Sequence, residues 1–155
     1  MKNTTLCYIE KDGAYLMIHR VKKKDDMNRD KWIGIGGKFE DGESPYDCAV
    51  REIREESGVI PKQLKYRGIV TFFSNQYGTE YMHLFTASGY EGEINYECDE
   101  GRLEWVKKAD VLSLPIWEGD KIFFELIDKD TDFFSLKLVY DGENLAEYTL
   151  NFARE

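Results

Sequence analysis

Residues 37–59 read GKFEDGESPYDCAVREIREESGV, and this stretch decides how the centre of the chain folds. Ser44 is a good helix N-cap, and the acidic residue three positions later completes a capping box. Pro45 suits the first helical position, where its missing N–H costs nothing. Gly58 supplies the stop at the other end. The stretch therefore predicts a loop followed by a helix over residues 45–57.

The predicted helix has two distinct faces at about 100° per residue. One arc is apolar and is expected to face the core: Tyr46, Ala49, Val50 and Ile53. A second arc of similar width carries three glutamates and a cysteine: Cys48, Glu52, Glu55 and Glu56. Like charges at these spacings repel by about a few tenths of a kcal/mol per pair. They also lie in the last turns, where the helix dipole disfavours negative charge.

Two explanations fit these electrostatic costs. One is a solvated acidic surface that is partly balanced by Arg51 and Arg54. The other is a bound cation, because Arg51 lies beside Glu52 and four residues before Glu55 and can orient both carboxylates. Hard oxygen ligands suit Mg²⁺ or Mn²⁺, which keep several waters and are completed by substrate phosphates. The Gly36–Gly37 backbone leads into the helix and could add a carbonyl ligand.

Composition limits the class of protein. The chain has 155 residues, of which 42% are hydrophobic, and this suits one folded domain with a sizeable core. Its net charge of −9 disfavours binding to a nucleic acid polymer, which requires a basic footprint. An anionic small molecule would need local cations or a bound metal.

The location of the protein is predicted from its apolar runs and its cysteines. No run approaches the roughly 20 apolar residues of a membrane span, so no membrane association is expected. The N-terminus lacks the apolar stretch of a signal peptide. Cys7, Cys48 and Cys98 are far apart and form no C-x-x-C pair. Reduced thiols and a cytoplasmic location follow as expectations, and the oligomeric state stays open between monomer and homodimer.

The rest of the chain alternates strands and helices. Strands are expected at 4–10, 14–20, 64–74, 80–88 and 102–106. Residues 32–38, WIGIGGK, suit a strand that runs into a loop whose backbone lies close to a ligand. Helices are expected at 108–113 and 117–128, and the C-terminal segment alternates like a hairpin around Asp141-Gly142. This order indicates an α/β or α+β layered domain.

The segment from residue 37 to 59 also resembles the Nudix box, G-x5-E-x7-R-E-U-x-E-E-x-G-U with U aliphatic. Nine positions are in register: Gly37, Glu43, Arg51, Glu52, Ile53, Glu55, Glu56, Gly58 and Val59. The resemblance implies a single Nudix domain over 1–155, with a mixed β-sheet sandwiched between helices. It implies hydrolysis of a nucleoside diphosphate linked to another group. Glu52 and Glu56 would be the principal metal ligands with help from Glu55, while Glu43 and Arg51 would support the loop and helix.

The resemblance further implies that a metal-activated water attacks a phosphorus atom. Lys38 follows the diglycine and either contacts phosphate as a further cation or stays in solvent. The general base is either Glu55, inside the box, or an acidic residue from outside it. Glu97, Asp99 and Glu100 precede the strand at 102–106, and Glu100 is the preferred outside candidate.

Features outside the box are similar to the MutT-like group, which hydrolyses oxidised purine nucleoside triphosphates to monophosphates. These features include W-x-G-x-G-G-K from residue 32 and P-x-W-x-x-D from residue 115. In that group the tryptophan stacks on the purine and acidic residues read its edge, which are roles for Trp117 and Asp120. The other possibility is that Trp117 packs its helix. Ile33 stands where the group has a base-contacting asparagine, and Gly119-Asp120 replaces a pair of aspartates.

Three functions follow as hypotheses. The first is a Mg²⁺-dependent nucleoside triphosphate diphosphohydrolase with substrates like 8-oxo-dGTP. The second is a Nudix hydrolase of ADP-ribose, a dinucleotide or a sugar nucleotide. The third is a nucleotide sensor that binds without hydrolysis, and the intact set of glutamates argues against it.

Overall fold

The computed structural model describes residues 1–153, which form one large mixed sheet, a two-stranded ribbon and three helical segments. The large sheet has nine strands in the order β11-β10-β5-β6-β1-β2-β9-β8, with β3 paired to β2. The strands are β1 (Lys2–Lys11), β2 (Ala14–His19), β3 (Trp32–Ile33), β4 (Ile60–Pro61), β5 (Leu64–Ser74), β6 (Gly78–Ala87), β7 (Tyr90–Glu91), β8 (Glu97–Cys98), β9 (Gly101–Lys107), β10 (Phe134–Asp141) and β11 (Asn144–Phe152). The helices are α1 (Pro45–Ser57), the 3-10 helix η1 (Lys108–Ser113) and α2 (Glu118–Asp128). Among the described residues, no helix is both long and apolar enough to cross a bilayer.

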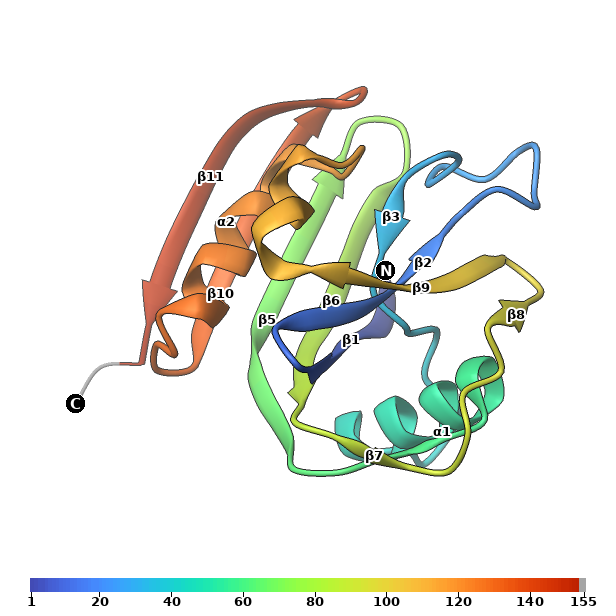
Figure 1. The fold of residues 1–155 in the computed structure, drawn as a ribbon. Helices are drawn as coiled ribbons and strands as arrows, with labels where there is room; N and C mark the ends of the chain where they lie inside the picture. Colours follow the sequence, from blue (N-terminus) through green and yellow to red (C-terminus); the bar gives the residue numbers. More distant parts are fainter. Residues whose placement is uncertain (154–155) are drawn as a thin grey trace.

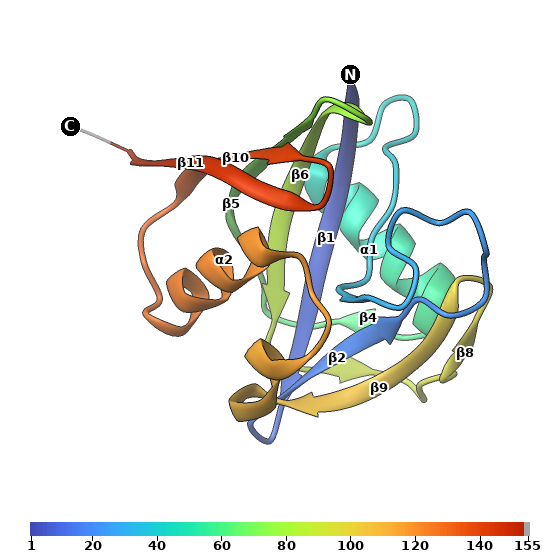
Figure 2. The ribbon, with the colours of Figure 1, turned by 90° about the horizontal axis from the view of Figure 1, so that it is seen from above.

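Strand β1 is the centre of the molecule because helices cover both of its faces. It pairs in parallel with β6, and α1 and α2 lie on opposite sides of this pair (Figures 1 and 2). Leu6 and Tyr8 point into the core cluster beneath α2, whereas Cys7 and Ile9 point into the cluster beneath α1. A strand buried on both faces is apolar without alternation, and residues 4–9 are all buried. The expected sandwich of a mixed sheet between helices is confirmed.

Most expected elements are confirmed within two or three residues. The helix at 45–57 has the predicted bounds, and β10 and β11 form the predicted hairpin. The segment 32–38 is extended over a shorter length than expected, because β3 covers two residues and only isolated bridges to β1 follow it. The two-residue strands β4, β7 and β8 were not predicted, since their pairing is set by tertiary contacts.

The predicted faces of α1 need two corrections. Cys48 was placed on the acidic arc but is fully buried, because the loop before the helix covers it and its Sγ lies 3.4 Å from Thr5 Oγ1. Tyr46 was placed on the core arc but is 46% exposed, and one edge of its ring packs on Phe85. The buried stripe is therefore centred on Ala49 and Ile53 and turned toward the acidic arc.

Candidate active site

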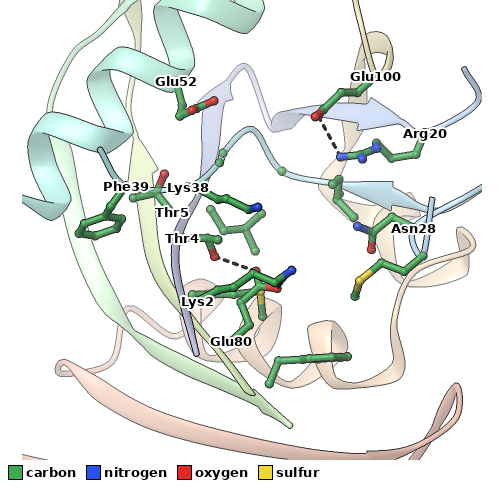
Figure 3. A pocket seen from close by; sticks show the side chains of 18 of the residues that line it. Lys2, Thr4, Thr5, Arg20, Asn28, Lys38, Phe39, Glu52, Glu80 and Glu100 are labelled. Carbon is green, nitrogen blue, oxygen red and sulfur yellow. Dashed lines mark hydrogen bonds and ion pairs between the residues drawn. The ribbon is translucent and has the colours of Figure 1, made fainter. Parts of the chain in front are cut away.

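A cavity of about 680 Å³ opens between α1, β1 and the start of α2. Two parts of its lining are named for use below. One is the acidic end, and the other is the base end, which is named for the nucleobase that the sequence resemblance leads us to expect there. The acidic end comprises Arg51, Glu52, Glu55 and Glu100, together with Glu56, whose Oε2 atom is buried. The base end comprises Met27, Asn28, Ile33, Phe72, Met82, Trp117 and Asp120. Figure 3 shows Glu52 and Glu100 at one side of the cavity, away from Lys2 and Glu80.

Two glycines bring the loop before α1 into contact with β1 and the acidic end. A Cβ atom on Gly36 would lie 1.7 Å from the Thr5 carbonyl oxygen, and one on Gly37 would lie 2.5 Å from the Glu52 carboxyl carbon. Only residues without a side chain allow this approach. The Gly37 carbonyl oxygen accepts hydrogen bonds from Thr5 N at 2.9 Å and from Cys48 Sγ at 3.6 Å. That oxygen therefore faces β1 and the buried thiol, so the close approach of Glu52 is the clearer reason for glycine at 37.

Arg51 organises the acidic end from its rim. Its Nε and Nη2 donate to the two carboxylate oxygens of Glu43, at 2.7 and 2.9 Å, which is the bidentate geometry of strong charged pairs. Its Nη1 donates to Glu52 at 2.8 Å and to Glu55 at 3.2 Å. It also donates to the Lys38 carbonyl oxygen at 2.9 Å. These bonds to Glu43 lower the pKa of that carboxyl and raise the pKa of Arg51. Arg51 thus ties the loop to the helix, as expected.

Glu56 is the most perturbed group of the acidic end. Burial, together with the negative charges of Glu100 and Glu52, raises its pKa to about 9. Within the described residues, its Oε2 atom is buried and has no hydrogen-bond partner. Burial also raises the pKa of Glu52, although Arg51 opposes the shift. An unpaired buried carboxylate oxygen costs free energy that a cation would recover.

Glu100 joins this cluster from a distant part of the sequence. The turn between β8 and β9 carries it, and Arg20 Nη1 donates to its Oε2 at 2.9 Å (Figure 3). The other two acidic candidates of that turn do not line the cavity. Glu97 is paired with Lys22 at 2.8 Å, and Asp99 is exposed. Of the three candidates named from the sequence, the structure thus brings Glu100 to the acidic end.

The acidic end has donors that suit a divalent cation. Residues 1–153 contain no preassembled group of three metal-ligating side chains. Mg²⁺ needs no such cage, since it binds through one or two carboxylates, several waters and substrate phosphates. Glu52 and Glu56 are two such carboxylates, and the Glu56 Oε2 atom has no partner among the described residues. Glu55 is 57% exposed at the rim. The donor set therefore fits Mg²⁺ or Mn²⁺.

Trp117 is both a core residue and part of the cavity lining, so it packs its helix as the second alternative expected, and its stacking on a purine stays a prediction. It is 6% exposed, and its ring packs edge-on against Phe72 and Tyr140, at 5.5 and 5.1 Å between centroids. The Lys31 ammonium lies 4.6 Å from its ring centroid. Trp117 is therefore held rigidly where it meets the cavity.

Asp120 supplies a carboxyl group beside Trp117. It is 5% exposed, and burial raises its pKa to about 8 although the nearby Lys31 lowers it. The carboxyl is therefore largely protonated at neutral pH and can donate a hydrogen bond. Ile33 lines the same end with an apolar side chain, and Lys38 lies on the cavity wall toward the acidic end.

The missing second aspartate has a packing explanation. A Cβ atom on Gly119 would lie 2.4 Å from Leu138 Cδ1 and 2.8 Å from the Tyr140 hydroxyl. The Gly119 N–H also donates to that hydroxyl at 2.7 Å. A side chain at 119 would therefore meet β10, so the base end has one aspartate where the MutT-like group has two.

Several lining residues were not predicted from the sequence. They are Lys2, Thr4, Met27, Asn28, Phe72, Glu80 and Met82. They come from β1, the loop before β3, β5 and β6, and no local motif marks them. Their common signal is topological, because adjacent strands of one sheet present them to the same cavity.

Comparison with known proteins bears directly on this geometry. The family model of the NUDIX domain matches residues 2–127 of the chain. The chain belongs to the Nudix family. It is therefore a Nudix pyrophosphohydrolase. Residues 37–59, which form the loop, α1 and all of the acidic end except Glu100, are its Nudix box. Nudix hydrolases generally use divalent metal ions.

The alignments with related proteins cover most of this chain. The uncharacterized Nudix hydrolase YvcI of Bacillus subtilis is 29% identical over 97% of this chain and 95% of its own. The oxidized purine nucleoside triphosphate hydrolase of Danio rerio is 33% identical over 81% of this chain and 79% of its own. Among solved structures, the MutT protein from Bacillus halodurans superposes with a TM-score of 0.85 at 29% identity, covering 97% of this chain and 98% of that one. These matches confirm the Nudix fold and the MutT-like resemblance.

Proposed function

We propose that this protein is a Mg²⁺-dependent nucleoside triphosphate diphosphohydrolase, with Mn²⁺ as an alternative ion. It would convert oxidised purine nucleotides such as 8-oxo-dGTP, with water, to the monophosphate and pyrophosphate. The observation that carries the proposal is that one cavity joins a carboxylate cluster with an unsatisfied buried oxygen to an indole and a buried carboxyl. The similarity to the Danio rerio oxidized purine nucleoside triphosphate hydrolase supports this choice of substrate.

The acidic end would bind the cation and the phosphates. When bound, the cation lowers the pKa of a water and neutralises phosphoryl charge. Glu52 and Glu56 would hold it, with Glu55 assisting from the rim. Lys38, on the cavity wall, would contact a phosphate oxygen. The Gly37 carbonyl stays a predicted ligand, and it would have to share its oxygen with Thr5 N–H.

The water that attacks phosphorus must lose a proton to a nearby base. Glu100 is proposed for this role for two reasons. Arg20 holds one of its oxygens by a hydrogen bond, and its negative charge is close enough to raise the pKa of both Glu52 and Glu56. Glu55 is the competing candidate, and its carboxylate is held by Arg51. Fixed orientation of a base matters because proton transfer requires contact within hydrogen-bond distance.

The base end would bind the nucleobase. Trp117 would stack on the purine, since an indole offers a large rigid surface. Asp120 would hydrogen-bond to its edge, and Ile33 would contact it through apolar atoms. The substrate is expected to be a free nucleotide rather than a polymer, given the net charge of −9. A cytoplasmic location is proposed with it, since all three cysteines are free thiols.

Product analysis with a nucleotide panel and Mg²⁺ tests the proposal. Pyrophosphate plus a monophosphate from 8-oxo-dGTP, formed faster than from dGTP, is the expected result. Formation of AMP plus ribose phosphate from ADP-ribose, with the triphosphates intact, would instead support a Nudix hydrolase of ADP-ribose. Tight nucleotide binding with no product would instead indicate a sensor.

A further inference from the structure

Asn28 presents an amide to the base end in a fixed orientation. Trp117 Nε1 donates to its Oδ1 at 2.7 Å. An indole N–H can only donate, so the amide oxygen must face Trp117 and the NH₂ group must point elsewhere. Figure 3 shows that nitrogen directed toward the cavity, which Asn28 lines. In the described part of the chain, no acceptor is hydrogen-bonded to this NH₂ group, so its two donors are available to a ligand.

A partly buried ion pair holds Asn28 in place. Its backbone N–H donates to Asp26 Oδ1 at 3.0 Å, and Arg20 Nε donates to Asp26 Oδ2 at 2.7 Å. The side chains of Arg20 and Asp26 are 13% and 6% exposed. The same arginine binds Glu100 at 2.9 Å, so one continuous set of hydrogen bonds links the acidic end to the base end. Donors fixed in this way lose little entropy when a ligand binds.

The base end has few other polar groups for a purine edge. Ile33 offers none, and Gly119 has no side chain. Asp120 is mostly protonated at neutral pH because burial raises its pKa to about 8, so it also offers a donor. Asn28 and Asp120 thus both present donors, and donors are satisfied by carbonyl oxygens and ring nitrogens. Two further polar residues of the lining, Thr4 and Glu80, are hydrogen-bonded to each other at 2.8 Å.

We propose that Asn28 is a specificity-determining residue that selects purine nucleoside triphosphates with a carbonyl group over those with an amino group at C6. The inference rests on the proposed function and names the base chemistry of the same site. A 6-amino group would place a donor against the Asn28 NH₂ and leave both without acceptors. Buried polar groups without partners are costly, and sites built on hydrogen bonds reject such substrates strongly.

The closing experiment compares kcat/KM for two triphosphates that differ at C6, dITP and dATP, and for their 8-oxo forms. Wild-type protein is expected to prefer the 6-oxo member of each pair. Asn28→Asp keeps an oxygen for Trp117 and turns the donor into an acceptor. The preference ratio should fall by about tenfold or more, because one good contact to a base edge has this magnitude.

Trp117→Phe gives a second, independent variant. The ring remains for stacking, but the N–H that fixes the amide is lost, so Asn28 can turn and present either atom. Discrimination should fall toward equal kcat/KM for both substrates, and the ratio of the two is the readout because the altered ring also changes stacking on either base. Asn151→Asp, at an exposed position of β11, adds the same charge outside the cavity and should keep the wild-type ratio.

The possible failures are distinct. If wild-type protein hydrolyses no triphosphate, the proposed function falls. If it hydrolyses them and both variants keep the wild-type ratio, or lose both substrates equally, the role of Asn28 is overturned.

Discussion

The acidic end and the base end of the cavity are built in opposite ways. The acidic end comes almost entirely from 23 consecutive residues, and its hydrogen bonds connect a loop to the helix that follows it. The base end collects side chains from β3 and the loop before it, from β5 and β6, and from the start of α2. One end is specified by a local pattern, and the other by the packing of the whole sheet. Reaction chemistry and substrate choice can therefore change independently in this fold.

The largest expected effect comes from breaking the acidic end. Glu52→Gln or Glu56→Gln removes a negative oxygen that the cation needs, so kcat/KM should fall by roughly a thousandfold or more. The fold should survive, because Gln has the volume of Glu and the Glu56 carboxyl is already protonated at neutral pH without metal. Hydrolysis of the preferred nucleotide and circular dichroism measure the two properties. Glu104→Gln, at an exposed position of β9, is the matched control. Near-normal turnover in both variants would remove the metal assignment.

The second effect distinguishes the two candidates for the general base, Glu100 and Glu55. Glu100→Gln should lower kcat by about a hundredfold, as expected for loss of a positioned general base. Glu55→Gln should cost less than about tenfold, since that carboxylate is 57% exposed and lies at the rim. Rates in saturating Mg²⁺ and nucleotide decide between them. The reverse order of losses would assign the base to Glu55.

The same contrast explains what could be predicted from the sequence. The bounds of α1, its capping box and the cluster of Glu52, Glu55 and Glu56 depend on neighbours in the chain. Glu100 could be named only as one of three acidic residues, because its place depends on Arg20, 80 positions away. Asn28 carried no signal at all, since its contact with Trp117 spans 89 positions. The burial of Cys48 was missed for the same reason, because a covering loop is invisible to helical periodicity.

A third, smaller effect probes why the base end departs from the related group. Gly119→Ala places a methyl group against Leu138 and the Tyr140 hydroxyl. The free energy of unfolding should fall by about 1–3 kcal/mol, which is typical of overpacking. Chemical denaturation measures it. Gly119→Asp should lose at least as much and gain no base contact, because the position faces β10. A stable Gly119→Asp variant with improved kcat/KM for an oxidised purine would contradict this explanation.

The last effect is the pH dependence of stability in metal-free protein, and it separates the two ends by their carboxyls. Burial raises the pKa of Glu56 to about 9 and of Asp120 to about 8. Between about pH 4.5 and these values, the folded state holds protons that the unfolded state has released. The unfolded state then binds fewer protons, so the free energy of unfolding falls as pH rises through this window.

The melting temperature should therefore decline from pH 5 to pH 9, and Glu56→Gln and Asp120→Asn should each flatten the decline. Mg²⁺ should restore stability at high pH in wild type and in Asp120→Asn but not in Glu56→Gln, because the cation stabilises the ionised carboxylate of the acidic end alone. Equal rescue of Glu56→Gln would show that the cation binds without Glu56.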